Sequence, residues 1–219
     1  MLDHGLPDAQ VFFGAIGDQY SDEYPLQVGQ FEAGTEELDK WLTSVVLERG
    51  GGAQDMESYQ LAWLFAARHT SLDCFEKRNE KGFLFTIGDE WMHPTVEPEF
   101  VEGILGYRPQ TAFKSEDLLR EAQRMYNVFH LHIHETTTGR DASISDRWKD
   151  LLGEHLIMVE DYNDVAEIIA TTVAVVRGAH LHDVVKDFDS KTAGSVSNAL
   201  VHVTAGAVAK RTDSGVMVL

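Results

Sequence analysis

Short apolar runs alternate along the chain with stretches in which apolar residues recur every three or four positions. The clearest run is FLFTI at positions 83–87; it stops at Gly88, and two carboxylates, Asp89 and Glu90, follow directly. A short apolar run between turn signals is typical of a buried parallel strand. Because ligands of open parallel sheets bind beyond the carboxyl ends of the strands, Asp89 lies where such a protein would bind a hard cation. The alternative is that Gly88-Asp89 is only a turn that leads into the next helix.

The same two patterns predict the other elements. The first two strands should pair antiparallel because the link between them is short. Helices are indicated by apolar spacings of three and four, by acidic first turns and by closing glycines. We expect strands at 11–16, 27–31, 83–87, 128–133 and 155–159, helices at 35–49, 58–77, 97–105, 115–126, 146–152, 161–176 and 195–210, and a loop at 187–195.

Strands and helices alternate through the middle of the chain, which predicts an α/β fold. We expect a three-layer sandwich in which a mainly parallel, doubly wound sheet carries helices on both faces. With 219 residues the chain is long enough for one sizeable core. The expected organisation is an α/β domain over residues 1–178, with residues 179–219 forming a C-terminal helical extension packed on the same domain.

Composition narrows the expected partners. The net charge is −18, from 36 acidic and 18 basic residues, so the surface repels phosphate backbones and nucleic-acid binding is not expected. This acidity suits cations or basic protein partners, although it also serves solubility alone. The single cysteine, Cys74, fits a reducing compartment. Without an 18-residue apolar run or a signal-like N-terminus, we expect a cytoplasmic protein with no membrane partner.

Acidic residues follow several predicted strands. Ile16-Gly17-Asp18 repeats the pattern of Ile87-Gly88-Asp89, and Glu135 and Glu160 also come directly after apolar runs or close to them. In a parallel sheet these ends meet at one edge. Several carboxylates in one cleft raise each other's pKa unless a cation lies among them. An all-oxygen set favours Mg²⁺, Mn²⁺ or Ca²⁺ over Zn²⁺.

Histidines form the second conspicuous pattern. His130, His132 and His134 alternate along a predicted strand and therefore face one side of it. Three histidines can ligate zinc, but same-face neighbours on one strand lie roughly 6–7 Å apart, which suits a shared ion poorly. We interpret them as packed or hydrogen-bonded residues. The sequence has no phosphate-binding Gly-x-x-x-x-Gly-Lys-Ser/Thr, Gly-x-Gly-x-x-Gly or Gly-x-Ser-x-Gly motif.

Three segments together resemble a von Willebrand factor type A (vWA) domain of the intracellular bacterial or phage kind. They are VFFGAIGDQY with the short strand after it, LERGGGAQDMESYQLAWLF, and FLFTIGDEW. The resemblance covers roughly residues 11–178 and is carried by the order and spacing of the segments. It implies a doubly wound sheet flanked by helices. It also implies a metal-ion-dependent adhesion site, usually with Mg²⁺, that an acidic residue of a protein partner completes.

The resemblance also implies individual site residues. Asp89 matches the late aspartate of the family. The family's loop threonine falls near positions 54–57, where this chain has no threonine, so Glu57 is the substitute oxygen ligand, with Ser58 close by. Asp18 has no standard role in the family, but its position after the first strand makes it a candidate. The expected metal ligands are therefore Asp89, Asp18 and Glu57.

The chain departs from the family at its start. The family's first strand, with its Asp-x-Ser-x-Ser motif, would precede Val11, and the ten residues there contain no such strand. We expect that the sheet closes without it, that a second chain supplies it, or that the chain is a fragment; metal affinity would then be weakened or lost. An Asp-x-Ser-x-Ser does occur at Asp141, Ser143 and Ser145, either as part of a rearranged ion site or as ordinary loop and cap residues.

The sequence thus predicts a non-catalytic protein-binding module in which a divalent cation bridges Asp89, nearby oxygens and a carboxylate of the partner. One alternative is a metal-dependent hydrolase or phosphotransfer enzyme that uses the same acidic residues, with His93 or His134 as general base in a deep pocket. Another is a structural domain of the same fold that binds no metal.

Overall fold

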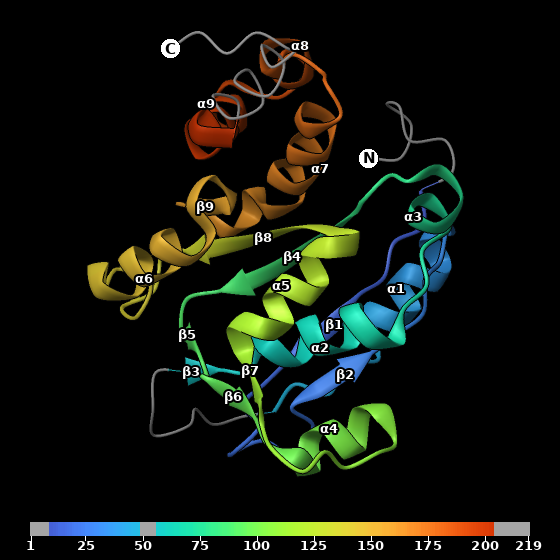
Figure 1. Cartoon of the computed structure of the whole chain (residues 1–219). Helices are drawn as coiled ribbons and strands as arrows, with labels where there is room; N and C mark the ends of the chain where they lie inside the picture. Colours follow the sequence, from blue (N-terminus) through green and yellow to red (C-terminus); the bar gives the residue numbers. More distant parts are fainter. Residues whose placement is uncertain (1–8, 49–55, 204–219) are drawn as a thin grey trace, which may run out of the picture. The chain divides into compact units, whose positions relative to one another are not determined.

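The computed structural model describes residues 9–48 and 56–203, which form a mixed α/β structure (Figure 1). The chain divides into two compact units. Unit 1 comprises Met1–Leu84 and Glu90–Val128, and unit 2 comprises Phe85–Asp89 and Phe129–Leu219. The boundary expected after residue 178 falls inside unit 2. The predicted division into an α/β domain and an extension stays a prediction.

The described residues of unit 1 form three small pairs of strands. The first is antiparallel, with Gly14 opposite Val28, which confirms the pairing expected from the short link. It is shorter than expected, and Val11 only forms an isolated bridge with Glu32. The second pair is parallel and the third antiparallel. The strands are β1 (Gly14–Ile16) with β2 (Leu26–Val28), β3 (Met56–Glu57) with β5 (Trp91–Met92), and β6 (Thr95–Val96) with β7 (Phe113–Lys114).

The core of unit 1 lies where helices α2 and α5 pack on one another. Helix α2 is apolar around most of its circumference and buries Trp63 and Leu64 completely. Helix α5 is amphipathic and turns Leu118 and Ala122 inward. The helices of this unit are α1 (Thr35–Thr43), α2 (Tyr59–His69), α3 (Asp73–Arg78), α4 (Pro98–Leu105) and α5 (Ser115–Met125).

The single helix expected over residues 58–77 is wrong, because the structure divides it into α2 and α3. The break begins at Thr70, whose backbone is extended. Its Oγ1 lies 2.6 Å from the carbonyl oxygen of Ala66 and 2.6 Å from the hydroxyl of Tyr126. Leu72 is also extended and is buried. Contacts with a distant residue therefore end a helix that the apolar spacing alone would continue.

Helix α1 also differs from the expectation. It starts at Thr35 as predicted but ends at Thr43, where the hydroxyl of Ser44 lies 2.6 Å from the carbonyl oxygen of Lys40. No residue of α1 is buried, and Leu42 is 55% exposed. A 3.6-residue period shows that a helix has an apolar side, but it does not supply a surface to cover that side.

Unit 2 is organised around the sheet β4-β8-β9, of which β4 and β8 also contribute residues to unit 1. Strands β8 and β9 pair in parallel from His130 opposite Leu156 to Ile133 opposite Val159, which agrees with the expected parallel sheet. The middle strand, β8, is almost entirely buried. Strand β4 is an outer strand of this sheet, and Thr86 is its only buried residue. The expectation that this strand is fully buried is therefore wrong. The strands are β4 (Gly82–Gly88), β8 (Tyr126–Ile133) and β9 (Leu156–Val159).

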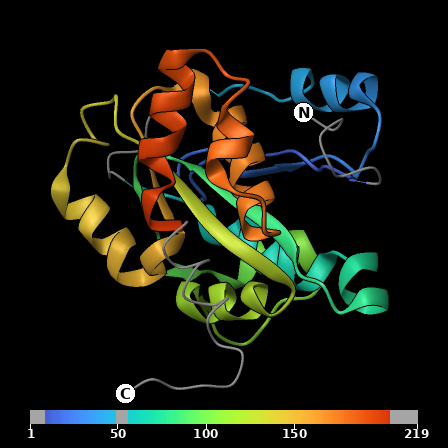
Figure 2. The ribbon, with the colours of Figure 1, turned by 90° about the horizontal axis from the view of Figure 1, so that it is seen from above.

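Helices α6 and α9 pack on β9, and α7, α8 and α9 pack on one another. Helices α7 and α9 lie side by side (Figure 2). The carboxylate of Asp189 accepts hydrogen bonds from two backbone N–H groups and starts α9 at Ser190. The loop expected over residues 187–195 is therefore wrong, and the expected helix beyond residue 203 lies outside the described residues. The helices are α6 (Ala142–Leu152), α7 (Val165–Val176), α8 (Leu181–Val185) and α9 (Ser190–Ala199).

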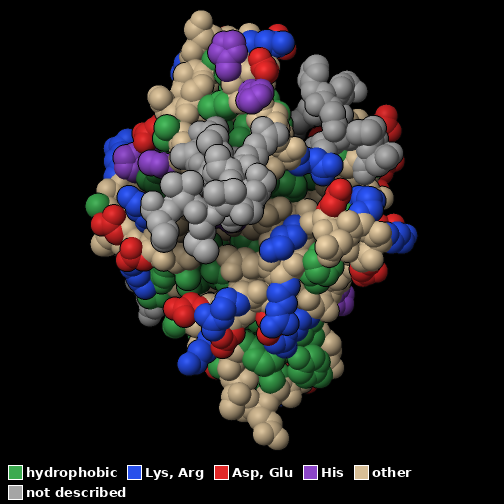
Figure 3. All heavy atoms as spheres, turned by 45° about the horizontal axis from the view of Figure 1, so that its top comes forward, with side chains coloured by type: hydrophobic (Ala, Val, Ile, Leu, Met, Phe, Trp, Pro, Cys, Tyr) green, Lys and Arg blue, Asp and Glu red, His purple; other side chains and the backbone are tan. Residues whose placement is uncertain are grey.

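On the face drawn in Figure 3, Lys and Arg are interspersed with Asp and Glu, so the net negative charge is not gathered into one patch there. Among the helices of residues 9–48 and 56–203, none has the length and apolar character needed to cross a membrane.

Candidate functional site

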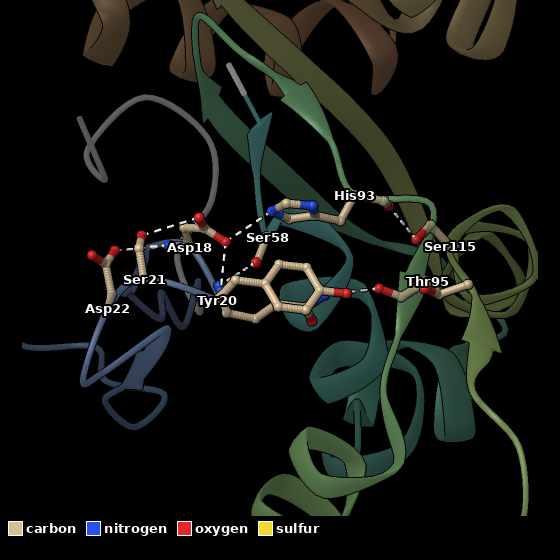
Figure 4. A network of polar contacts seen from close by, with 9 residues as sticks. Asp18, Tyr20, Ser21, Asp22, Ser58, His93, Thr95 and Ser115 are labelled. Atoms are coloured by element: carbon tan, nitrogen blue, oxygen red, sulfur yellow. Dashed lines mark hydrogen bonds and ion pairs between the residues drawn. The ribbon is translucent and has the colours of Figure 1, made fainter. Parts of the chain in front are cut away.

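A buried polar network in unit 1 is built around Asp18 and His93 (Figure 4). Asp18 follows β1 and His93 follows β5; they are 5% and 3% exposed, and Asp18 Oδ1 lies 2.8 Å from His93 Nε2. The same Oδ1 accepts a hydrogen bond from the backbone N–H of Tyr20 at 3.0 Å, and Oδ2 accepts one from the hydroxyl of Ser21 at 3.0 Å. Both oxygens of the Asp18 carboxylate are therefore engaged within the protein.

The loop that carries Asp18 is a compact turn. The Asp18 N–H donates to Asp22 Oδ2 at 2.8 Å, and the Asp22 N–H donates to the Asp18 carbonyl at 2.9 Å. Gly17 lies so close to the Asp22 carboxylate that a Cβ atom would clash with it. The Gly-Asp pattern after the first strand is thus explained by turn chemistry.

Three further hydrogen bonds, two of them buried, hold this network in place. The Gln19 N–H donates to Ser58 Oγ at 2.7 Å, and Gln19 Nε2 donates to the carbonyl of Thr95 at 3.0 Å. The hydroxyl of Ser115, at the start of α5, donates to the carbonyl of His93 at 2.6 Å. Figure 4 shows Asp18, Ser58 and His93 pointing toward one another from three different segments. The network therefore links parts of unit 1 that are far apart in sequence.

Glu57 lies beside this network on β3, where its carbonyl accepts a hydrogen bond from the His93 N–H. Partial burial raises the pKa of Glu57 to about 7, with added repulsion from Glu90, Asp22 and Asp18. Its Oε2 atom is buried and has no hydrogen-bond partner among the described residues. The carboxyl groups of Glu57, Glu90, Asp22 and Asp18 are called the acidic cluster below, and the charges of the other three disfavour ionisation of Glu57.

The third predicted ligand, Asp89, belongs to unit 2, whereas Asp18 and Glu57 belong to unit 1. Asp89 follows β4, and its Oδ2 accepts a hydrogen bond from the hydroxyl of Thr136 at 2.5 Å. That hydroxyl also accepts a bond from the Gly139 N–H at 2.8 Å. The structure thus brings Asp18 and Glu57 into one cluster and gives Asp89 a role in ordering the loop after β8.

The fit of a metal ion to these residues is incomplete. Within residues 9–48 and 56–203, no three His, Cys, Asp or Glu side chains are grouped so that they could hold an ion. Three hydrogen bonds leave Asp18 with a single lone pair, on Oδ2, for another partner. Glu57 is better suited, because its Oε2 is unengaged. The glycine-rich segment at 50–54, which precedes a predicted helix and is therefore also expected to reach this edge, lies outside the described residues.

The histidines of β8 are packed and hydrogen-bonded. The His130 ring stacks on Trp148 with centroids 3.9 Å apart, and its Nδ1 lies 2.9 Å from Thr86 Oγ1. His132 Nε2 donates to the carbonyl of Gly139 at 2.9 Å. Burial lowers the pKa of both rings, of His130 most strongly. His134 is more exposed, with Nδ1 3.2 Å from Glu160 Oε2. These contacts agree with the interpretation made from the alternating pattern.

The Asp-x-Ser-x-Ser motif forms the start of α6. Asp141 accepts a hydrogen bond from the Ser143 N–H at 2.8 Å and is the N-cap. Ser143 also lowers the pKa of Asp141, first through its side chain and then through its backbone. The Ser145 hydroxyl donates to the Ala142 carbonyl within the helix. The expected helix start at residue 146 is therefore wrong. Asp141 caps a helix that begins at Ala142, four residues before the predicted start.

Tyr20 is the main feature of this region that the sequence did not indicate. Its ring meets the His93 ring edge-on at 4.8 Å and the Phe100 ring at 6.2 Å, yet the residue is 59% exposed. Locally, only the place of Tyr20 two residues after Asp18 sets it apart. Its ring partners, Phe100 and His93, belong to α4 and to the segment after β5. An aromatic side chain fixed beside an acidic cluster is a suitable contact point for another molecule.

No protein-family model, no curated protein and no solved structure matches this chain. The chemistry of the region therefore rests on its geometry. The acidic cluster can bind positive charge, whereas the Asp18–His93 pair holds two loops together.

Proposed function

We propose that this chain is a non-catalytic protein-binding module and that a divalent cation, Mg²⁺ in the first place, assists binding at the acidic cluster. The observation that carries the proposal is the carboxyl group of Glu57, which has a pKa of about 7 and an unpartnered, buried Oε2. A cation beside it would offset the repulsion from Asp18, Asp22 and Glu90. Carboxylate oxygens are the ligands that Mg²⁺ and Mn²⁺ prefer.

A carboxylate of the protein partner would complete the coordination, because Glu57 and one lone pair of Asp18 leave most positions open. Tyr20 and Tyr24, which are 59% and 47% exposed, offer aromatic contacts near the turn that carries Asp18. Tyrosine is enriched among the residues that contribute most to protein interfaces. Asp89 remains a proposed metal ligand in this function. The fold proposed with it is the doubly wound, three-layer vWA type, and a second chain is the candidate source of the missing strand.

The experiment is calorimetric titration of the metal-stripped chain with Mg²⁺ and Mn²⁺ at pH 6 and pH 8. We expect a dissociation constant on the order of 1 mM or below at pH 8. Affinity should be weaker at pH 6, because the ion then competes with the proton on Glu57. Glu57→Gln should abolish binding, and Asp89→Asn tests whether Asp89 contributes. Glu36→Gln, on the exposed side of α1, is the matched control.

A second titration tests the role of the partner. Acetate and N-acetyl-aspartate amide stand in for the partner's carboxylate and should bind to the Mn²⁺-loaded chain but not to the metal-free chain. The absence of Mn²⁺ binding by the folded wild-type chain would exclude the cation-assisted function. Equal binding by the wild type and Glu57→Gln would place any ion elsewhere.

A metal-dependent hydrolase or phosphotransfer enzyme is the second candidate. It is favoured only by the Asp18–His93 pair, in which a carboxylate contacts an imidazole as in a general-base pair. The hydroxyls nearest in the network are already used: Ser58 Oγ accepts from Gln19, and Ser115 Oγ donates to the His93 carbonyl. The pair is also almost completely buried. These contacts support a structural role for the pair and place the enzyme second.

A further inference from the structure

Unit 2 contains a cavity of about 380 Å³ beside the carboxyl end of β9. Its lining combines two kinds of surface. Glu160, Asp161 and Asp164 contribute carboxyl groups, whereas Met158 and Ala199 contribute apolar atoms. The carboxyl end of a strand in a parallel sheet is a common place for a ligand. An acidic wall next to an apolar one suits a molecule with a positive head and an aliphatic stem.

The charges that face the cavity are unequal. The lining residues include three with carboxyl groups and one with an ammonium, Lys191. Lys191 Nζ is 2.6 Å from Asp161 Oδ2 and holds the pKa of Asp161 down to about 2, helped by hydrogen bonds from Asn163. His134 lies beside Glu160, with Nδ1 3.2 Å from its Oε2. The lysine is thus engaged at Asp161, and Asp164 has no ion pair at salt-bridge distance among the described residues.

Asp164 provides an independent sign of a missing donor. The residue is only 6% exposed, and its Oδ1 accepts a hydrogen bond from Thr192 Oγ1 at 3.3 Å. Its Oδ2 is buried and has no hydrogen-bond partner in the described part of the chain. Buried carboxyl oxygens are almost always hydrogen-bonded, so an unpartnered one on a residue that lines a cavity points to a ligand that donates.

We propose that this cavity binds an alkylammonium group, with the ammonium beside Asp164 and Glu160 and the aliphatic stem against Met158 and Ala199. An ammonium has three donors and can serve several carboxyl oxygens at once. A metal ion is a poorer occupant, since the described residues do not group three ligands for one. This site is independent of the cation proposed at Glu57, which belongs to unit 1.

The test is calorimetric titration of the full chain with 1,5-diaminopentane and with Nα-acetyl-lysine methylamide. Pentan-1-ol, which has the stem without the charge, should not bind. Asp164→Asn keeps the size of the side chain and the acceptor for Thr192 but should weaken amine binding about tenfold or more. Asp150→Asn, on the exposed face of α6, removes the same charge from unit 2 and should leave binding unchanged.

A second variant keeps the proposal falsifiable if Asp164→Asn folds poorly. Ala199→Leu fills the apolar side without altering any charge and should also abolish binding. Tighter binding of the lysine derivative would identify a protein side chain as the source of the ammonium, and tighter binding of the diamine would identify a free amine.

Three results would overturn the site: no saturable binding by the folded wild type, equal losses in Asp164→Asn and Asp150→Asn, or tighter binding of Nα-acetyl-arginine methylamide, which would assign a guanidinium instead. Glu57→Gln should retain amine binding, so the two proposals fail separately.

Discussion

Asp18 Oδ1 lies 2.8 Å from His93 Nε2, and this hydrogen bond joins positions that are 75 residues apart. The carboxylate also holds Tyr20 and Ser21 of its own turn. One buried side chain thus fixes the turn after β1 and ties it to the segment after β5.

Replacing Asp18 with Ala should destabilise unit 1 by about 2–3 kcal/mol, because it leaves buried donors on His93 and Tyr20 without an acceptor. Urea unfolding monitored by circular dichroism measures this change. Asp39→Ala, on exposed α1, should change the free energy of unfolding by less than about 0.5 kcal/mol. A similar small effect of both substitutions would show that the Asp18 network is not a structural element.

The raised pKa of Glu57 predicts a stability that falls as pH rises. Below the ordinary pKa of 4.5 the group is protonated in both states. Between that value and about 7 the folded state binds the proton more tightly, so stability is lost as pH increases through this range. Allowing for partial exposure, the loss is about 1–2 kcal/mol at pH 8 in metal-free buffer.

Comparison of the wild type with Glu57→Gln at pH 4 and pH 8 isolates this effect. The variant should be more stable than the wild type at pH 8 and nearly equal to it at pH 4. Identical pH profiles would show that Glu57 titrates normally.

The lowered pKa of His130 predicts that stability depends on pH in the opposite direction. Burial lowers its pKa well below 6.5, so the folded state keeps the ring neutral while the unfolded state binds a proton below that pH. Stability contributed by the neutral ring is therefore lost as pH falls below about 6.5. Chemical unfolding at pH 7 and pH 5.5 measures this loss of stability.

His130→Phe is the informative variant. It can keep the stacking on Trp148, and Thr86 retains a second contact with the Phe129 carbonyl. We expect the variant to be less stable at pH 7 but to lose less stability than the wild type between pH 7 and pH 5.5. A variant with the same pH dependence as the wild type would contradict a neutral buried ring.

Gly139 is predicted to be intolerant of a side chain. A Cβ atom there would overlap the carbonyl oxygen of Ile133, a backbone atom that cannot rotate away. Gly139→Ala should cost about 1–3 kcal/mol and weaken the loop that holds Asp89 through Thr136. Gly103→Ala, within α4 and with open space around it, should instead stabilise the chain by about 0.5–1 kcal/mol. Thermal unfolding of both variants tests the contrast.

The sequence indicated most elements because each depends on local chemistry. The run at 83–87 and the alternating apolar positions at 128–133 are strands, as predicted, and Thr35 and Ser115 begin helices. Some errors come from local caps that the apolar spacing does not reveal, such as Asp141 before α6 and Asp189 before α9. Another comes from a distant contact that overrides the local pattern. Tyr126 meets Thr70 at the break between α2 and α3.

The candidate site was predictable only in part. Asp18 was expected from its position after the first strand, and Glu57 from the resemblance to the vWA family. The burial of Glu57 and the bond from Asp18 to His93 were not expected, because they depend on the pairing of β3 with β5. Asp164 could also be recognised as a candidate only from the tertiary structure, because helix capping explains an acidic residue at that position equally well.

By itself, the sequence determined the mixed α/β character, the parallel strands of the middle region and the strongly acidic charge, because periodicity and composition are properties of neighbouring residues. Only the tertiary structure decided which carboxyl groups lack a partner. A carboxyl group's pKa and unmet hydrogen bonds depend on burial and on groups brought together from distant positions, as Glu57 and Asp164 show.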